Sequence, residues 1–341
     1  MTRHGFGRLL ALTLMAGSLA LGSIQAMANE AIHIGVSNRS LFGLPVLVAQ
    51  QKGFFKEEGV EVTIDYFGGG TPATAALIGG SVQFIDAAFE NNVKTVKRGQ
   101  PIVTVMNIQT DFAGAIIVRK DIADKFGGKP TLENLKGLRL GTLARGGFAD
   151  VSARYVLHKA GLEPDVDVQL VPIKGSDRQL TAGEAGEIEA AFVMEPYGAI
   201  GVEGQDKWAY VINITAGEGP DVFQGLGYIT LQTTRDYVKE HRPTVEKVVR
   251  ALVKAQSYIN DPKNIDELSS IADKEYGGAG VDIMKVSIER QVHAFQPAMN
   301  PKMVDKTVEL LVSSKSIEAP APSYEEVVDT SFAPLWEQFK K

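Results

Sequence analysis

The sequence predicts an α/β protein of two lobes with a helical C-terminal portion, and three observations lead to that fold class. Strand-like and helix-like runs alternate up to about Thr230, which is typical of parallel sheets covered by helices. The chain has 341 residues, 44% of them hydrophobic, and exceeds the size at which one core usually stops growing. One turn–helix–strand unit also has a counterpart in each half of the alternating region.

The first series of elements begins directly after residue 30. Its predicted strands span residues 32–37, 60–67, 82–87 and 102–109. A helix is expected over 45–51, because Pro45 stands in its first turn, where the missing N–H costs nothing. Thr71 and Pro72 are predicted to be the N-cap and the first residue of the next helix.

A second series follows with the same alternation. Its predicted strands span residues 139–143, 166–172 and 188–193, and a helix is expected over 148–160. After about Thr230 the pattern becomes helical. One face of a long helix is marked there by Val245, Val248, Val249, Leu252 and Ile259.

The recurring unit runs from Gly68 to Glu90 and again, more weakly, from Lys174 to Pro196. Each copy reads as a turn, a short helix, a glycine, a buried strand and a polar elbow. Ligands of open α/β sheets bind beyond the carboxyl ends of the strands. The elbows at 88–91 and 194–197 are therefore expected to face one cleft from opposite sides, unless the likeness is only the general similarity of such units.

Residues 1–28 are predicted to be a cleaved signal peptide. Arg3 and Arg8 precede an apolar run over residues 9–21, and Ala28 ends an A-x-A cleavage signal. That run is short for a membrane span, which needs about 20 apolar residues. The sequence has no cysteine, so there is none at the cleavage site to carry a lipid. We expect a chain that starts at Asn29 and lies free in the periplasm of a Gram-negative cell.

Charge and motifs exclude several function classes. The formal net charge is -6, and loss of Arg3 and Arg8 makes the mature chain more acidic, which argues against nucleic-acid or anionic-membrane partners. The glycine turn at 68–70 carries no Walker lysine and fits no dinucleotide motif. The five histidines have no metal-ligand spacing, and no G-x-S-x-G elbow is present. We expect neither an enzyme nor a cofactor or metal site.

Four stretches resemble periplasmic binding proteins of the nitrate, sulfonate and taurine ABC importers, a group that includes pyrimidine-precursor binders of the NMT1/THI5-like branch and related synthases. They are "IGVSNRSLFGLPVLVAQQKGFFKEEGVEVTI", "GGTPATAALIGGSVQF", "LKGLRLGTLARGGFADVSARYVLHKAGL" and "AAFVMEPYGAI". The resemblance implies a type II, Venus-flytrap fold that closes on its ligand. It suggests lobe one at 29–114, lobe two at 115–225, and a return to lobe one with C-terminal helices at 226–341.

In lobe one the resemblance places three loops at the ligand. Asn38 and Ser40 would donate or accept hydrogen bonds, and Phe42 would form an apolar wall, although this loop also fits a plain helix cap. The glycine turn would let the backbone approach the cleft and aim a helix N-terminus at it. The candidate contacts from the turn and the elbow are Gly69, Gly70, Thr71, Ala88, Phe89 and Glu90. Phe89 and Glu90 depart from the small polar residues usual in this family.

In lobe two the resemblance places a turn and an elbow at the ligand. The candidate contacts are Arg145, Gly146, Gly147, Phe148, Met194, Glu195 and Tyr197. The family's hydroxyl residues are absent from the turn, and a methionine, which equally fits core packing, replaces the family's aromatic residue at the elbow. We therefore expect an organic ligand with an apolar or aromatic part and a hydrogen-bond donor, in preference to nitrate or sulfate. The alternative is that Glu90 and Glu195 cap helices and do not meet the ligand.

The favoured function is the monomeric solute-binding subunit of an ABC importer, which passes a small molecule to a permease and its cytoplasmic ATPase. Two alternatives remain open at this stage: an enzyme related to pyrimidine synthesis, and a periplasmic sensory protein that moves no cargo. Residues 113–116 and 224–229, which are rich in small side chains, are the predicted hinges.

Overall fold

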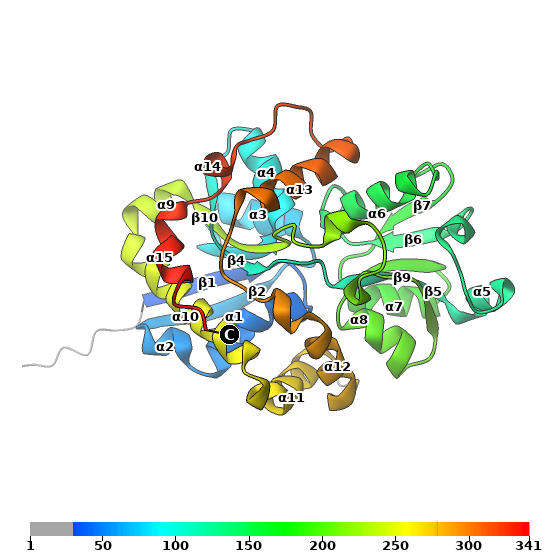
Figure 1. The fold of residues 1–341 in the computed structure, drawn as a ribbon, viewed down its shortest axis with the longest axis horizontal. Coiled ribbons are helices and arrows are strands. Elements are labelled where there is room, and N and C mark those ends of the chain that lie inside the picture. The colour runs from blue at the N-terminus through cyan, green and yellow to red at the C-terminus, as the bar shows by residue number, and fades with distance from the viewer. Residues whose placement is uncertain (1–29, 278, 341) are drawn as a thin grey trace, which may run out of the picture.

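The computed structural model describes residues 30–277 and 279–340. The predicted signal peptide and its cleavage site therefore lie outside the described residues. The described chain forms two lobes side by side, each built on one five-stranded sheet (Figure 1). The predicted two-lobe α/β class is confirmed.

The two sheets are built from ten strands. In lobe one the order is β2 (Val60–Tyr66), β1 (Glu30–Val36), β3 (Phe84–Ala88), β10 (Ile229–Thr234) and β4 (Ile102–Gln109). In lobe two the order is β7 (Gln169–Pro172), β6 (Arg139–Thr142), β8 (Ala190–Met194), β5 (Gly114–Arg119) and β9 (Trp208–Asn213).

The sheets contain the expected parallel pairs but are mixed, because one strand in each sheet runs against its neighbours. The strand β10 pairs antiparallel with both β3 and β4, and β5 pairs antiparallel with both β8 and β9. Each of these strands is the first that the chain forms after it crosses into that lobe. Because the chain enters each lobe from the side on which the parallel strands end, this first strand runs in the opposite direction to them.

The recurring unit of the sequence forms matching elements in the two lobes. The first copy gives α3 (Gly70–Ile78) and β3, and the second gives α7 (Ser176–Glu184) and β8, with every bound shifted by the same number of positions. Both strands are the central strand of their sheet. The helix α3 begins before Thr71 and has Gly69 as its N-cap, so the predicted N-cap at Thr71 was wrong.

Helices cover both sheets and fill the C-terminal part. In order they are α1 (Leu44–Gln51), α2 (Phe54–Glu57), α4 (Phe89–Lys97), α5 (Lys120–Ala123), α6 (Phe148–Lys159), α8 (Tyr197–Ala199), α9 (Arg235–Glu240), α10 (Arg242–Asn260), α11 (Ile265–Tyr276), α12 (Val281–Gln291), α13 (Pro301–Ser313), α14 (Tyr324–Val327) and α15 (Ala333–Trp336). The predicted apolar face of α10 is buried. The helix α10 packs on α1 and α2, whereas α13 contacts both α4 of lobe one and α6 of lobe two (Figure 1).

The chain passes between the sheets twice, over residues 110–113 and 214–228. The predicted hinge at 113–116 overlaps β5, since Gly114 already pairs with β8, and Ala115 and Ile116 pair with both β8 and β9. Gly114 is needed there for close packing, because a Cβ would stand 2.5 Å from the Phe112 ring and 2.3 Å from the Val193 carbonyl oxygen. Any bending at this crossing must therefore fall before the strand.

A cluster of aromatic side chains fills the junction between the lobes. The rings of Phe112 and Phe192 stack with centroids 5.3 Å apart, and those of Phe148 and Tyr228 lie 4.6 Å apart. Phe223, from the second crossing, lies 5.6 Å from Phe112. Both crossings thus contribute to one apolar core between the lobes.

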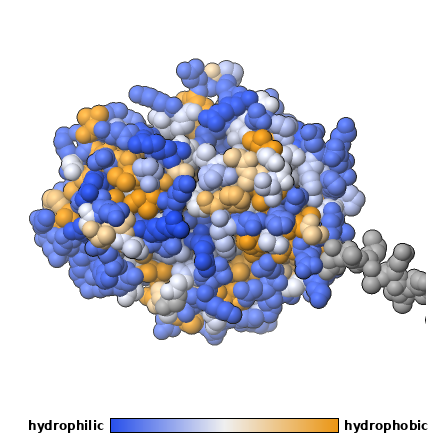
Figure 2. Space-filling view, turned by 180° about the vertical axis from the view of Figure 1, so that it is seen from behind, coloured by the Kyte–Doolittle hydropathy of each residue, from blue (hydrophilic) through white to orange (hydrophobic). Residues whose placement is uncertain are grey.

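The outer surface carries apolar residues in separate patches, and hydrophilic residues cover most of the face seen in Figure 2. Within residues 30–277 and 279–340, no helix combines the length and apolar character that a membrane span requires.

Candidate ligand-binding site

A cleft lies between the lobes where strands of both sheets end. Asn38 follows β1, Gly69 follows β2 and Ala88 ends β3, while Ala144 follows β6 and Met194 ends β8. Ligands of open α/β sheets bind at such carboxyl ends. The full lining consists of Ser37, Asn38, Phe42, Gly69, Gly70, Ala88, Asn91, Leu143, Ala144, Gly147, Phe148, Ala149, Met194, Tyr228 and Ile229.

The two lobes touch each other around this cleft, which encloses about 20 Å³. The Asn38 amide Nδ2 donates to the Ser176 hydroxyl oxygen at 3.4 Å, and the Leu41 N–H donates to the Glu195 carbonyl at 2.8 Å. Lys94 Nζ donates to the carbonyl oxygen of Gly146. The space holds about one water molecule, so the structure represents a closed arrangement of the lobes.

The glycine turn before α3 packs against both a cleft side chain and the opposite lobe. A Cβ on Gly70 would lie 2.2 Å from Asn91 Nδ2, and one on Gly69 would lie 3.0 Å from the Cβ of Ala144 in lobe two. Side chains at these positions would displace the Asn91 amide or separate the lobes. Close backbone approach is therefore the physical reason for glycine at Gly69 and Gly70.

The walls of the cleft are aromatic and its polar groups are neutral. Phe42 meets the edge of Tyr228 at 6.0 Å, and Phe148 lies against the same ring. Burial raises the pKa of Tyr228 well above its usual range, so its hydroxyl stays protonated. Among the residues that the structure describes, no charged side chain lines the cleft, and its hydrogen-bonding side chains are Ser37, Asn38, Asn91 and Tyr228.

The candidate residues from the sequence fall into three groups. Those that line the cleft are Asn38, Phe42, Gly69, Gly70, Ala88, Gly147, Phe148 and Met194. Those that line an adjoining groove are Thr71, Arg145 and Gly146. Those that line neither are Ser40, Phe89, Glu90, Glu195 and Tyr197, all of them buried.

Glu90 is held inside lobe one by a cation. Its carboxylate lies 2.7 Å from Lys94 Nζ, one helical turn further along α4, and both side chains are buried. Burial raises the pKa of the Glu90 carboxyl, and the positive charge of Lys94 opposes that rise. The pair brings no net negative charge to the cleft.

Glu195 turns away from the cleft towards the helix α12. Its carboxylate accepts hydrogen bonds from the Ala199 N–H at 3.3 Å and from the hydroxyls of Thr215 at 3.4 Å and Ser287 at 3.5 Å. Burial raises the pKa of Glu195 to about 7, against the lowering effect of the Ala199 amide and of Arg290. Glu195 thus accepts a hydrogen bond from the last residue of the short helix α8, whose N-cap is Pro196, and it does not line the cleft.

The contacts named from the sequence omit seven lining residues. They are Ser37, Asn91, Leu143, Ala144, Ala149, Tyr228 and Ile229. Asn91 belongs to the elbow at 88–91 that was expected to face the cleft, and Ser37 precedes Asn38 in the first contact loop. Leu143, Ala144 and Ala149 lie within two positions of a predicted contact, so a wider window would have included them. Tyr228 ends the second crossing and Ile229 begins β10, and this segment was interpreted only as a hinge.

No group of three or more metal-ligating side chains occurs in the part of the chain that the structure describes. The cleft lining also contains no histidine or carboxylate. Its chemistry is that of hydrogen bonding and apolar contact.

Comparison with known sequences identifies the family. The model of the NMT1-like family matches residues 25–273. The chain belongs to the NMT1-like family. It is 26% identical over 296 residues to YtlA of Bacillus subtilis (strain 168), whose name proposes a role as a binding protein; the match covers 85% of this chain and 84% of YtlA.

Solved structures share the fold. The alkanesulfonate-binding protein SsuA of Xanthomonas axonopodis pv. citri, bound to MOPS, aligns with a TM-score of 0.70 at 16% identity, over 87% of this chain and 97% of SsuA. The periplasmic nitrate-binding protein NrtA of Synechocystis PCC 6803 aligns with a TM-score of 0.69 at 14% identity, over 90% of this chain and 88% of NrtA. The chain therefore has the periplasmic binding protein fold found in ABC import systems.

An enzyme occurs among the structural neighbours as well. The desulfurization enzyme DSZB aligns with a TM-score of 0.61 at 14% identity, over 91% of this chain and 99% of that one. The fold alone therefore does not separate binding from catalysis.

Proposed function

We propose that this NMT1-like protein is the periplasmic solute-binding subunit of an ABC importer. It captures a small organic molecule between its lobes and delivers it, as a monomer, to an inner-membrane permease driven by a cytoplasmic ATPase. The observation that carries the proposal is a neutral, aromatic-walled cleft at the facing carboxyl ends of two sheets with the same strand layout. Mostly apolar pockets with a few polar anchors are typical of small-molecule sites.

The same lining supports an organic ligand with an apolar or aromatic part. Phe42, Phe148 and Tyr228 offer ring faces and edges, and Asn38 and Asn91 offer amide groups. A bare oxyanion such as nitrate or sulfate gains most from charged donors, which the described lining does not supply. This argument rests on the lining itself, because neither Glu90 nor Glu195 faces the cleft.

Capture requires the lobes to separate. Ligand pockets usually measure about 300–1,000 Å³, whereas this cleft encloses about 20 Å³. The two crossings at 110–113 and 214–228 are the segments whose bending would open it. Opening breaks the contacts of Asn38 with Ser176 and of Lys94 with Gly146.

A thermal-shift screen tests the proposal. The panel contains nitrate, sulfate, alkyl and aryl sulfonates, aromatic carboxylates and pyrimidines. An organic compound should raise the melting temperature, because it binds only the folded state, and Asn38→Ala should reduce that rise. A matched variant outside the cleft, Asn264→Ala, should not. A strong shift with nitrate or sulfate alone would contradict the proposed ligand class.

Two further measurements address transport and location. Small-angle scattering should show the protein becoming more compact when the compound from the screen binds. N-terminal sequencing of a periplasmic extract should give a chain that begins at Asn29. A membrane-bound or uncleaved product would contradict the proposed location.

An enzymatic function is less well supported, although DSZB has this fold. No histidine, carboxylate or cysteine lines the described cleft, and burial keeps the hydroxyl of Tyr228 protonated, so a general base or a thiol nucleophile has no candidate group there. Recovery of the screened compound unchanged after long incubation separates binding from catalysis.

A further inference from the structure

A groove of about 620 Å³ adjoins the cleft on the side of α3 and α4. Asn91 lines both spaces, and the neighbours Gly70 and Thr71 line one each. Lobe two contributes Arg145 and Gly146 to the groove. The groove therefore opens at the boundary between the lobes, directly outside the closed cleft.

The groove concentrates positive charge on an acidic protein. Lys94, Arg98 and Arg145 line it, and no acidic residue does so within the described chain, although the whole sequence carries a formal charge of -6. Glu90 already neutralises Lys94 at 2.7 Å. The other two cations are exposed, and the nearest acidic group to Arg145 is Asp165 at 3.8 Å, outside the lining.

A buried hydroxyl without a partner points to the same place. Thr74 lines the groove, is only 7% exposed, and its Oγ1 has no hydrogen-bond partner among the described residues. A buried hydroxyl of this kind costs free energy unless something bonds it. Beside it, Ala75 and the 45% exposed Ile78 supply an apolar wall.

We propose that this groove binds the oxyanion group of an organic ligand, through Arg98, Arg145 and the hydroxyl of Thr74, while the uncharged part of the same ligand lies in the cleft. The cargo is then an organic acid with an apolar body, such as a carboxylate or sulfonate. This inference rests on the proposed function and adds the position of the charged group.

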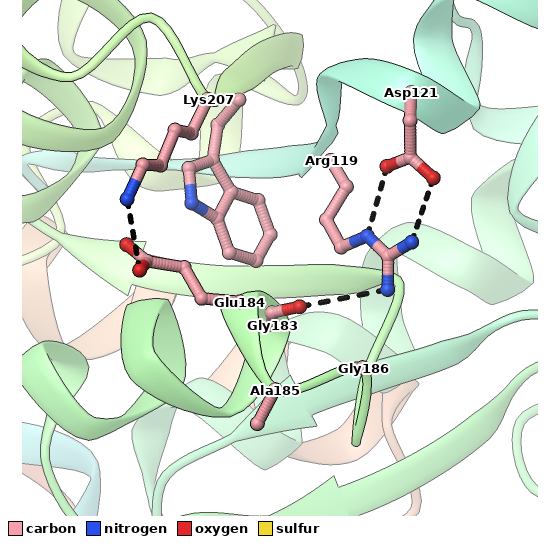
Figure 3. Close-up of a pocket in the computed structure, with 8 residues that line it drawn as sticks. Arg119, Asp121, Gly183, Glu184, Ala185, Gly186 and Lys207 are labelled. Carbon is pink, nitrogen blue, oxygen red and sulfur yellow. Dashed lines mark hydrogen bonds and ion pairs between the residues drawn. The ribbon is translucent and has the colours of Figure 1, made fainter.

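A hollow of about 500 Å³ in lobe two provides the contrast (Figure 3). It also contains two cations, but each is paired inside the hollow. Arg119 contacts Asp121 at 2.9 and 2.6 Å, and Lys207 lies 2.8 Å from Glu184 (Figure 3). Its charge is balanced internally, so we expect no anion binding there.

The test uses two fluorescent probes that differ by one sulfonate group: 8-anilinonaphthalene-1-sulfonate and N-phenyl-1-naphthylamine. The wild type should bind the sulfonate more tightly by about tenfold. The double variant Arg98→Gln/Arg145→Gln should bind the sulfonate probe about tenfold more weakly. Its affinity for the uncharged probe should not change. The matched pair Arg119→Gln with Lys207→Gln should change neither affinity.

Phe148→Ala, checked for folding by circular dichroism, separates this inference from the proposed function. This substitution should lower the affinity for both probes, because it removes an aromatic wall of the cleft. If the Arg98 and Arg145 pair has no effect, or if the lobe-two pair has an equal one, the groove proposal is overturned and the cleft is unaffected. If only the Arg98 and Arg145 pair acts, the groove is an anion site and the cleft proposal fails.

Discussion

Each copy of the turn–helix–strand unit carries a buried glutamate in the elbow after its strand, one position apart between the two copies, and the two lobes stabilise it in different ways. In lobe one, Glu90 follows β3 and pairs with the buried cation Lys94. In lobe two, Glu195 follows β8 and has neutral partners, the Ala199 N–H and two hydroxyls. The comparison shows that similar elbows bury a carboxyl either beside a cation or among neutral hydrogen-bond donors, and that burial raises the pKa of the carboxyl in both cases.

The difference affects how each lobe responds to pH and to substitution. A buried ion pair depends on both partners, because removing one leaves an uncompensated charge. A carboxyl held by neutral donors has no single counter-charge to lose, and burial raises the pKa of Glu195 to about 7. The following predictions test this comparison, from the largest expected effect to the smallest.

Lys94→Met should destabilise the protein most. It leaves Glu90 buried without its counter-charge and removes the contact with Gly146 across the cleft. We expect a loss of about 3–5 kcal/mol at pH 8, measured by urea unfolding. The double variant Glu90→Gln/Lys94→Met should recover much of it. A loss below about 1 kcal/mol for the single variant would contradict a structural role for this pair.

Glu195→Gln should change the pH dependence of stability. The unfolded carboxyl titrates near 4.5 and the folded one near 7, so between these values the folded state retains a proton that the unfolded chain releases. Wild-type stability therefore falls as pH rises through this window. The variant lacks that fall and should gain up to about 3 kcal/mol over wild type between pH 5 and 8.

The groups around Glu195 define the control for that titration. Arg290 and Glu203 pair at 2.9 Å nearby and both influence its pKa. Glu203→Gln should leave most of the pH-dependent fall in place, because burial is its main cause. Parallel stability curves for wild type and Glu195→Gln would show that Glu195 does not titrate there.

Gly70→Ala should lower the free energy of unfolding by about 1–3 kcal/mol, which is less than the loss expected for Lys94→Met. Its Cβ would lie 2.2 Å from Asn91 Nδ2, so the amide must move. The corresponding residue in lobe two is Ser176, which carries a side chain that bonds Asn38. Ser176→Ala should therefore cost less than Gly70→Ala in thermal unfolding. The reverse order would contradict the close packing at Gly70.

Thr74→Val should have the smallest effect on stability, and it should stabilise the protein. The hydroxyl has no partner within the described chain, and the corresponding lobe-two residue is the buried Leu180. We expect a gain of up to about 1 kcal/mol. Thr307→Val is the matched control and should be destabilising, since its hydroxyl lies 2.8 Å from the Leu226 carbonyl oxygen. Loss of stability in Thr74→Val would indicate an unrecognised hydrogen bond.

Local patterns in the sequence determined most of the secondary structure. The strand expected at 102–109 matches β4, and the apolar spacing from Val245 to Ile259 gave α10 its buried face. Alternation, proline in a first turn and helical spacing depend on neighbouring residues only, so they can be recognised without the fold. The two-lobe class followed from length and from the repeated unit.

Other features depended on contacts between distant parts of the chain. The strands β5 and β10 both contain β-branched residues, but the predicted hinges covered their starts, and the two strands that flank each of them come from distant parts of the chain. Tyr228 reaches the cleft only because the second crossing returns there. Arg98 and Arg145 meet in one groove because the lobes close. The orientation of Glu195 was decided by packing against α12, since burial and hydrogen-bond partners are set by three-dimensional contacts and not by sequence neighbours.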